Sequence, residues 1–145
     1  MIRPIALARR AAMAAAIVGV TAQAAPAQAR LVQVVEGARA AWLAHDVEHL
    51  VERSDTVRLR IPGVAVTAAV RPRQAARLLS GYLAHTVETA FVLKEIRNVG
   101  ADHAYAEMIR RYVVQGTSDE RLETVFFGFR VIDGEWRLRE VRVTP

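Results

Sequence analysis

Apolar residues recur with a helical period in the first part of the chain and alternate with polar residues in the last part. From Leu31 to Trp42 they follow the i, i+3, i+4, i+7 spacing of one helix face, which predicts an amphipathic first helix. Asp46 is a short acceptor in front of apolar residues at helical spacing, from Val47 to Val51. Such a residue is typical of an N-cap, so we expect a second, short helix that begins after Asp46.

The helical period changes to alternation after Asp55. Residues 56–61, "TVRLRI", predict a half-buried strand with its arginines turned outward. Pro62 and Gly63 form a turn signal, so residues 64–70 are predicted to be the partner strand of a hairpin. Pro72 then suits the first turn of a third helix, whose apolar residues again share one side.

Long strands dominate the rest of the sequence. Four segments are rich in aromatic and β-branched residues, and turn residues separate them, most clearly Asp133-Gly134. This spacing predicts an antiparallel meander. The four predicted strands are 87–96, 103–115, 121–132 and 135–143.

The predicted order of elements is ααββαββββ, with the helices gathered in the N-terminal half. That order predicts an α+β fold in which three helices pack on one face of a curved, mostly antiparallel sheet. One domain accounts for residues 30–145, a size that can bury a sizeable core. The chain has no cysteine, which excludes disulfides, thiolate zinc sites and cysteine nucleophiles.

Residues 1–29 predict a secretory signal peptide. A basic start is followed by the short apolar run "AAMAAAIVGVTA" and by small residues that allow cleavage after Ala24 or Ala29. The apolar run is short of the ~20 residues of a spanning helix, which leaves an uncleaved membrane anchor as the weaker alternative. We therefore expect an exported protein, periplasmic or secreted, with no stable membrane association after cleavage.

The net charge of +5 does not indicate a nucleic-acid partner. Cleavage after Ala29 removes Arg3, Arg9 and Arg10 and so more than half of that charge. The remaining charges are scattered, whereas nucleic-acid binding needs clustered cations aimed at phosphates. We expect no nucleic-acid binding and no cofactor.

Three segments carry a family resemblance. "WLAHDVEHLVERSDTVRLRIPG", "RPRQAARLLSGYL" and "DGEWRLREVRV" resemble helix, strand and hairpin segments of the nuclear transport factor 2-like superfamily, which includes SnoaL-type polyketide cyclases and ketosteroid isomerases. The resemblance covers residues 31–144 and is nearest to exported members of unknown function. It implies a cone-shaped roll, a cystatin-like shape in which the helices cover one end of the bent sheet.

The sequence His45-x-x-Glu48-His49 has the order of a zinc-peptidase helix. Such a site needs both histidines on one continuous helix, together with a third ligand. Because Asp46 is the predicted cap of a new helix, His45 precedes the break and His49 lies one turn inside. The two side chains should point in different directions, so we predict no metal site.

Members of the superfamily that are enzymes use acids, histidines or tyrosines on the concave sheet, so the resemblance directs attention to such residues here. The weak candidates are Glu107, Glu95, His103 and Tyr105. Their strand faces stay open, because both alternating sets of residues 103–115 mix polar with apolar. The alternative for Glu107 is a rim carboxylate paired with Arg110 or Arg111.

Large aromatic residues could line a ligand pocket inside the cone. The predicted wall consists of Trp42, Tyr82, Phe91, Phe127 and Trp136. The favoured alternative is that these rings simply fill the core, since each buries ~150 to 250 Å².

Arginines alternate outward along the predicted strands and could form an anion-binding patch. We expect Glu107, Glu123, Glu135 and Glu140 to neutralise it. The same face should carry exposed aliphatic residues such as Val141 and Val143 and is where related domains often dimerise. We therefore expect a homodimer.

Three functions remain open. The preferred hypothesis is non-catalytic binding of a small apolar molecule or a protein partner. The second is an acid/base enzyme of the same fold, similar to a cyclase or an isomerase, and the third is a purely structural dimerisation module.

Overall fold

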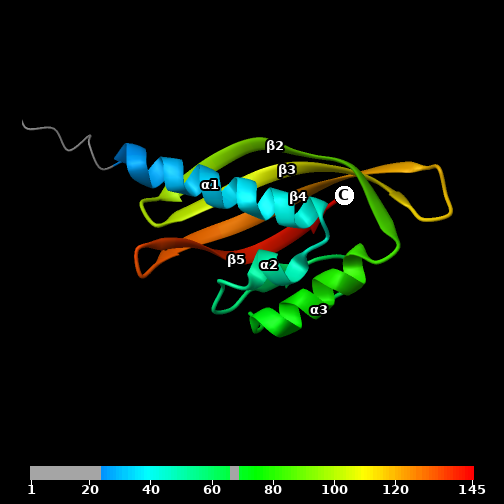
Figure 1. The fold of residues 1–145 in the computed structure, drawn as a ribbon, viewed down its shortest axis with the longest axis horizontal. Helices are drawn as coiled ribbons and strands as arrows, with labels where there is room; N and C mark the ends of the chain where they lie inside the picture. Colours follow the sequence, from blue (N-terminus) through cyan, green and yellow to red (C-terminus); the bar gives the residue numbers. More distant parts are fainter. Residues whose placement is uncertain (1–23, 66–68) are drawn as a thin grey trace, which may run out of the picture.

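The computed structural model describes residues 24–65 and 69–145. The predicted signal peptide lies mostly outside these residues. Three helices and five strands follow one another along the chain (Figure 1). They are α1 (Ala24–Leu43), α2 (Val47–Val51), β1 (Arg58–Arg60), α3 (Pro72–Leu83), β2 (Thr86–Gly100), β3 (His103–Val114), β4 (Glu120–Ile132) and β5 (Glu135–Thr144).

The strands form a single sheet in the order β1-β5-β4-β3-β2. Strands β2 to β5 are a continuous antiparallel meander, as the sequence predicts, and β1 adds a parallel pairing at the edge beside β5. The β4–β5 turn places Asp133 at φ 52° and Gly134 at φ 78°, the left-handed geometry that makes Asp-Gly a strong hairpin signal.

The break between α1 and α2 lies where the sequence predicts it. The Asp46 carboxylate accepts a hydrogen bond from the backbone N–H of His49 at 3.1 Å, which caps α2. His45 adopts φ 52°, so the chain turns sharply after α1. Helix α1 lies along one face of the sheet, and α2 and α3 lie side by side near β5 (Figure 1).

The predicted 56–70 hairpin differs in its second strand. Residues 66–68 lie outside the described residues, and Val70 contributes an isolated antiparallel bridge to Val57. The backbone of β1 instead pairs with residues 140–142 of β5. The pairing with β5 was not predicted, and of the predicted local partner the described residues show only the bridge at Val70.

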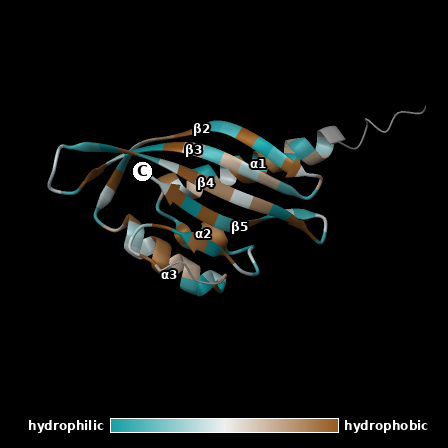
Figure 2. Cartoon of the chain, turned by 180° about the vertical axis from the view of Figure 1, so that it is seen from behind, coloured by the Kyte–Doolittle hydropathy of each residue, from teal (hydrophilic) through white to brown (hydrophobic). Residues whose placement is uncertain are grey.

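Alternation along β3 gives the sheet two different faces. The residues buried against the helices, which form the inner face, are Ala104, Ala106, Met108, Arg110 and Tyr112. The intervening residues form the outer face, which is seen in front of α1 when the molecule is viewed from behind (Figure 2). Arg58 and Arg60 of β1 point outward as predicted, because Leu59 between them is buried.

The expectation of exposed Val141 and Val143 is wrong. Both are buried, because they belong to the inner-face alternation of β5 opposite Phe127 and Val125.

No helix within the described residues combines the length and apolar character of a membrane-spanning segment.

Candidate functional site

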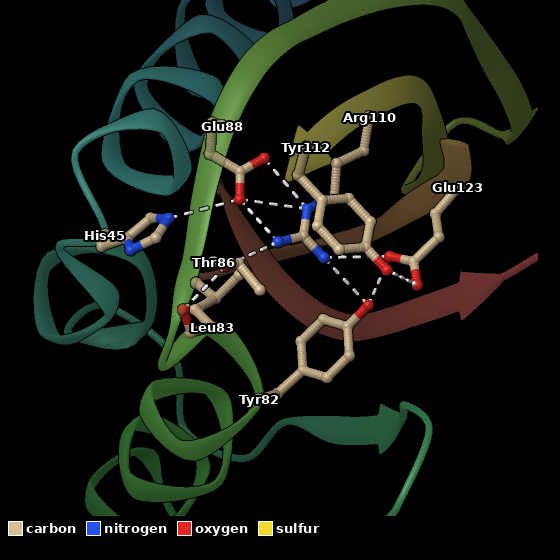
Figure 3. A network of polar contacts seen from close by, with 8 residues as sticks. All are labelled: His45, Tyr82, Leu83, Thr86, Glu88, Arg110, Tyr112 and Glu123. Atoms are coloured by element: carbon tan, nitrogen blue, oxygen red, sulfur yellow. Dashed lines mark hydrogen bonds and ion pairs between the residues drawn. The ribbon is translucent and has the colours of Figure 1, made fainter. Parts of the chain in front are cut away.

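A guanidinium is buried on the inner face, close to the end of β3 that adjoins α3. Arg110 of β3 has no exposed surface, and polar side chains from β2, β3, β4 and α3 surround it (Figure 3). We call this group the Arg110 cluster. Its members are Arg110, Tyr82, Thr86, Glu88, Tyr112 and Glu123.

Every nitrogen of the Arg110 guanidinium is satisfied within the cluster. Its Nε donates to Glu88 Oε2 at 2.9 Å, and one terminal nitrogen donates to Glu88 Oε1 at 2.6 Å and to Thr86 Oγ1 at 3.0 Å. The other terminal nitrogen donates to Glu123 Oε2 at 2.9 Å and to the Tyr82 hydroxyl at 3.0 Å. Such a forked pairing can offset the cost of taking an arginine out of water.

Strand register brings these groups together. Arg110 lies opposite Glu123 on β4 and opposite Phe91 on β2, while Glu88 lies opposite Tyr112. All of them therefore share the inner face. Tyr82 reaches the same point from the last turn of α3, and its hydroxyl donates to Glu123. The cluster thus ties α3 to strands β2, β3 and β4.

Aromatic rings close the remaining space around the guanidinium. Its central carbon lies 3.9 Å from the ring centroid of Tyr112, 5.3 Å from that of Tyr82 and 5.5 Å from that of Trp42. Rings at such distances attract a cation and exclude water from it. Arg110 is therefore both paired and desolvated.

The two histidines of the zinc-like motif serve different partners. His45 contacts Glu88 Oε1 through Nε2 at 3.2 Å and so joins the α1–α2 corner to the Arg110 cluster (Figure 3). His49 instead pairs with Glu52 at the surface of α2. The predicted divergence of the two side chains is confirmed. Within the described residues, no group of three potential metal ligands is found.

Burial changes the acidity of both tyrosines in the cluster. Desolvation raises the pKa of Tyr82 well above its ordinary value, and the hydrogen bond to Glu123 raises it further. The pKa of Tyr112 is also raised, again first by desolvation and then by its hydrogen bond to Glu123. Both phenols are thus held as neutral hydrogen-bond donors.

The predicted catalytic candidates lie together on the outer face, away from the helices. The rings of His103 and Tyr105 contact each other at an angle of 47°, with their centroids 4.8 Å apart, and Tyr105 shares a small cavity of about 110 Å³ with Glu95 and Glu107. Glu107 pairs with Lys94 at 2.9 Å, so its predicted pairing with Arg110 or Arg111 is wrong. The reason is that Arg110 points to the opposite face.

The residues of the predicted pocket wall lie in three different places. Trp42, Phe91 and Phe127 are buried against one another, with Trp42 stacked on Phe91 at 5.3 Å, and Tyr82 belongs to the Arg110 cluster. Trp136 alone of the five lines a cavity among those described. Core filling accounts for the three buried rings.

That cavity is an open groove of about 450 Å³ between α1, α2 and the β4–β5 hairpin, which we call the α1–α2–β5 groove. Its apolar lining includes Phe129, Trp136 and Leu138 from the hairpin, and His49 and Arg53 are at its polar edge. A larger groove of about 710 Å³ runs between α2 and α3. Its lining is richer in charged side chains and contains no aromatic ring.

Burial of Glu88 was not predicted from the sequence, and the expectation that Glu123 lies on the outer face is wrong, because it pairs with buried Arg110. A signal for Glu123 was present, because it shares the alternation of Val125 and Phe127, the apolar set of that strand. Arg110 likewise shares the alternation of small and apolar residues in β3. Charged residues in an apolar alternation point inward, and paired charges make that burial tolerable.

Solved structures share this fold at low sequence identity. A ketosteroid isomerase-like protein from Erwinia carotovora atroseptica is 17% identical, with a TM-score of 0.63 over 81% of this chain and 96% of that one. A DUF4783 family protein from Bacteroides uniformis is 16% identical, with a TM-score of 0.61 over 74% and 93%. A domain of unknown function with a cystatin-like fold from Nostoc punctiforme is 13% identical, with a TM-score of 0.62 over 82% and 76%.

These similarities show that the chain has the nuclear transport factor 2-like fold, as its sequence predicts. No family model matches the sequence, and no curated protein matches it either. Identities below one fifth establish the fold but carry no activity from one protein to another.

Replacement of the buried Arg110 should strongly destabilise the protein. Arg110→Met leaves Glu88 and Glu123 buried without their counterion, so we expect the free energy of unfolding to fall by about 3 to 5 kcal/mol. Urea denaturation measures the loss. The matched control is Arg111→Met on the outer face, whose exposed pair with Glu120 is worth less than about 1 kcal/mol. Adding Glu88→Gln and Glu123→Gln to Arg110→Met should recover part of the loss, and equal losses for the two arginines would contradict the account.

Alkaline pH should unfold the protein through its buried phenols. Because folding raises the pKa of Tyr82 and Tyr112, the folded state retains protons that the unfolded state loses above about pH 10. Stability is therefore complete below that pH and falls as the pH rises beyond it. In a Tyr105→Phe variant these are the two remaining tyrosines, so the ultraviolet absorbance of tyrosinate should appear only as near-ultraviolet circular dichroism is lost. Ionisation at about pH 10 with the fold intact would refute this.

Proposed function

We propose that the protein is a non-catalytic binding domain that holds a small, mostly apolar molecule in the α1–α2–β5 groove. The observation that carries the proposal is the contrast between this groove and the cone interior. The interior is filled by the Arg110 cluster and by packed rings, whereas the groove has about 450 Å³ of open space, lined in part by the half-buried side chains of Trp136 and Val34. Ligand sites are typically concave and largely apolar, with a few polar groups.

The groove lining favours an amphipathic molecule. Trp136 offers a half-exposed indole face, and Val34 and Ala38 of α1 extend the apolar surface opposite it. His49 and Arg53 also line the groove. They pair with Glu52 and Glu135 at the protein surface, and a polar or anionic end group of the ligand would compete with these exposed carboxylates. A flat apolar body with one polar end matches this distribution.

The arrangement of carboxylates supports binding over acid/base chemistry. A general base must reach the substrate with an oxygen free to accept a proton. The side chain of Glu88 is 3% exposed, and both its oxygens accept from Arg110. Glu107 and Glu95 pair with Lys94 and Arg97 on the outer face. An enzyme of the isomerase or cyclase type remains the alternative, and these pairings do not favour it.

Filling the groove should abolish binding. Gly37 of α1 lines the groove, and a Cβ added there meets no atom within 4 Å, so Gly37→Leu places its side chain in open space. We expect it to weaken binding of the amphipathic probe 1-anilinonaphthalene-8-sulfonate by at least about tenfold, because the leucine overpacks the occupied site. Fluorescence titration of the probe measures the affinity.

The matched control is Gly81→Leu on α3. Gly81 is also helical and equally open, but it lies away from the groove. Both substitutions favour the helix by ~0.5 to 1 kcal/mol, so a difference in probe binding reports the groove alone. If both variants bind the probe as the unmodified protein does, the α1–α2–β5 groove is not the binding site.

We also propose that the mature protein is exported and begins after Ala24. Two residues near the beginning of the described part of α1 contact the sheet. The Ala27 carbonyl accepts from Trp136 Nε1 at 3.3 Å, and Gln28 accepts from Asn98 at 3.0 Å. Cleavage after Ala29 would remove both contacts, so cleavage after Ala24 is favoured.

The proposal also includes a homodimer that forms through the part of the outer face made by β2, β3 and β4. Val92 is 58% exposed, Leu122 56% and Val87 47%, and their register places all three on that face. Exposed aliphatic residues that share one face favour association.

Native mass spectrometry of the protein purified from its host measures the number of chains in the assembly and the mass of the mature chain in one experiment. We expect a dimer of chains that begin at Ala25. Val92→Glu should convert the dimer to monomers, because it places a desolvated charge in each half of the interface. The control Val32→Glu changes a valine of 41% exposure on α1 and should leave the dimer intact. A monomeric unmodified protein would remove the basis for this interface.

A further inference from the structure

We propose that the outer face carries a binding site for a small-molecule oxyanion, a carboxylate or a phosphate, independent of the α1–α2–β5 groove. The site is a depression of about 330 Å³ across β1, β5, β4 and β3. We call it the outer arginine pocket. Its lining residues used in the argument are Arg58, Arg130, Arg139, Glu140, His103 and Tyr105.

A glycine makes the depression. Gly128 of β4 lies in one row across the sheet, between Glu140 on β5 and Tyr105 on β3. A Cβ at this position would lie 3.0 Å from Cε1 of Tyr105 and 3.1 Å from Cβ of Glu140, closer than side-chain carbons normally approach. The absence of a side chain lets Tyr105 lean over the strand and leaves space between the surrounding arginines.

A β-bulge turns an additional arginine into the pocket. The pairing of β4 with β5 shifts between Gly128 and Phe129, which leaves Arg139 as the extra residue between Leu138 and Glu140. Successive residues of a regular strand point to opposite faces, but a bulge redirects one of them. Arg139 and Glu140 therefore line the same pocket although they are neighbours in sequence.

The positive charge of the pocket is not neutralised as the sequence analysis expected. Glu123 faces the interior, Glu107 pairs with Lys94, and Glu135 pairs with Arg53, so of the four expected carboxylates only Glu140 lines the pocket. Glu140 lies 3.9 Å from Arg60.

Among residues 24–65 and 69–145, no carboxylate lies within ion-pair distance of Arg58, Arg130 or Arg139. Three cations therefore face one acid. This excess of positive charge is what an oxyanion would compensate.

The guanidinium groups of the pocket and its small volume favour a small oxyanion as the ligand. Guanidinium groups present paired N–H donors that match carboxylate and phosphate oxygens, and the Tyr105 hydroxyl and the His103 ring add polar groups beside them. The positive region is confined, because the outer-face carboxylates Glu95 and Glu107 line the adjacent small cavity. An extended polyanion such as a nucleic acid would meet these acids, whereas a single anionic group would not.

Isothermal titration of the full-length mature protein with inorganic pyrophosphate, and separately with citrate, tests the site. Both titrations are run at one ionic strength fixed with sodium chloride. We expect saturable binding of at least one probe, which Arg139→Gln or Arg130→Gln weakens by about tenfold through loss of a charge-assisted hydrogen bond. Preference for pyrophosphate identifies a phosphate ligand, and preference for citrate identifies a carboxylate.

The Glu140→Gln variant distinguishes an effect on the binding site from loss of binding through misfolding. This variant removes the one acid of the pocket and should tighten binding by several-fold, a gain that a damaged protein would not show. Arg71→Gln, at the exposed start of α3, is the charge-matched control and should leave the affinity unchanged. Failure of both probes to saturate, or equal weakening by Arg71→Gln and Arg139→Gln, would overturn the proposal.

Discussion

Burial of the Arg110 guanidinium is the constraint on which the rest of this structure depends. An arginine without exposed surface is tolerable only when carboxylates and neutral donors or acceptors surround it in a fixed geometry. Those groups come from β2, β4 and the end of α3, and His45 extends the network to the α1–α2 corner. Helices far apart in sequence are therefore positioned by one charge in addition to the apolar core.

The same burial leaves the interior of the cone without open space for a ligand. In a cone whose interior were open, the inner face would be the natural ligand site. Here the rings of Trp42, Phe91 and Phe127 and the Arg110 cluster occupy that space. Two of the accessible concave surfaces, the α1–α2–β5 groove and the outer arginine pocket, lie on opposite sides of the sheet.

Much of the fold could be predicted from the sequence because its signals are local. The Asp46 cap, the Pro72 helix start and the Asp133-Gly134 turn each act over a few residues, and the structure has all three. The site was harder to predict because it depends on pairings between strands. The alternation of β3 did not reveal which set faces inward, and the bulge that redirects Arg139 arises from the pairing of β4 with β5.

Hydrogen exchange of arginine side chains, followed by nuclear magnetic resonance, tests the buried guanidinium most directly. Arg110 Nε–H donates to Glu88 inside the protein, so its exchange should be the slowest among the arginine Nε–H groups and should require global unfolding. An Arg110→Lys spectrum assigns the signal. Exchange of Arg110 as fast as that of the exposed arginines would contradict the account, because the cone interior would then be open to water.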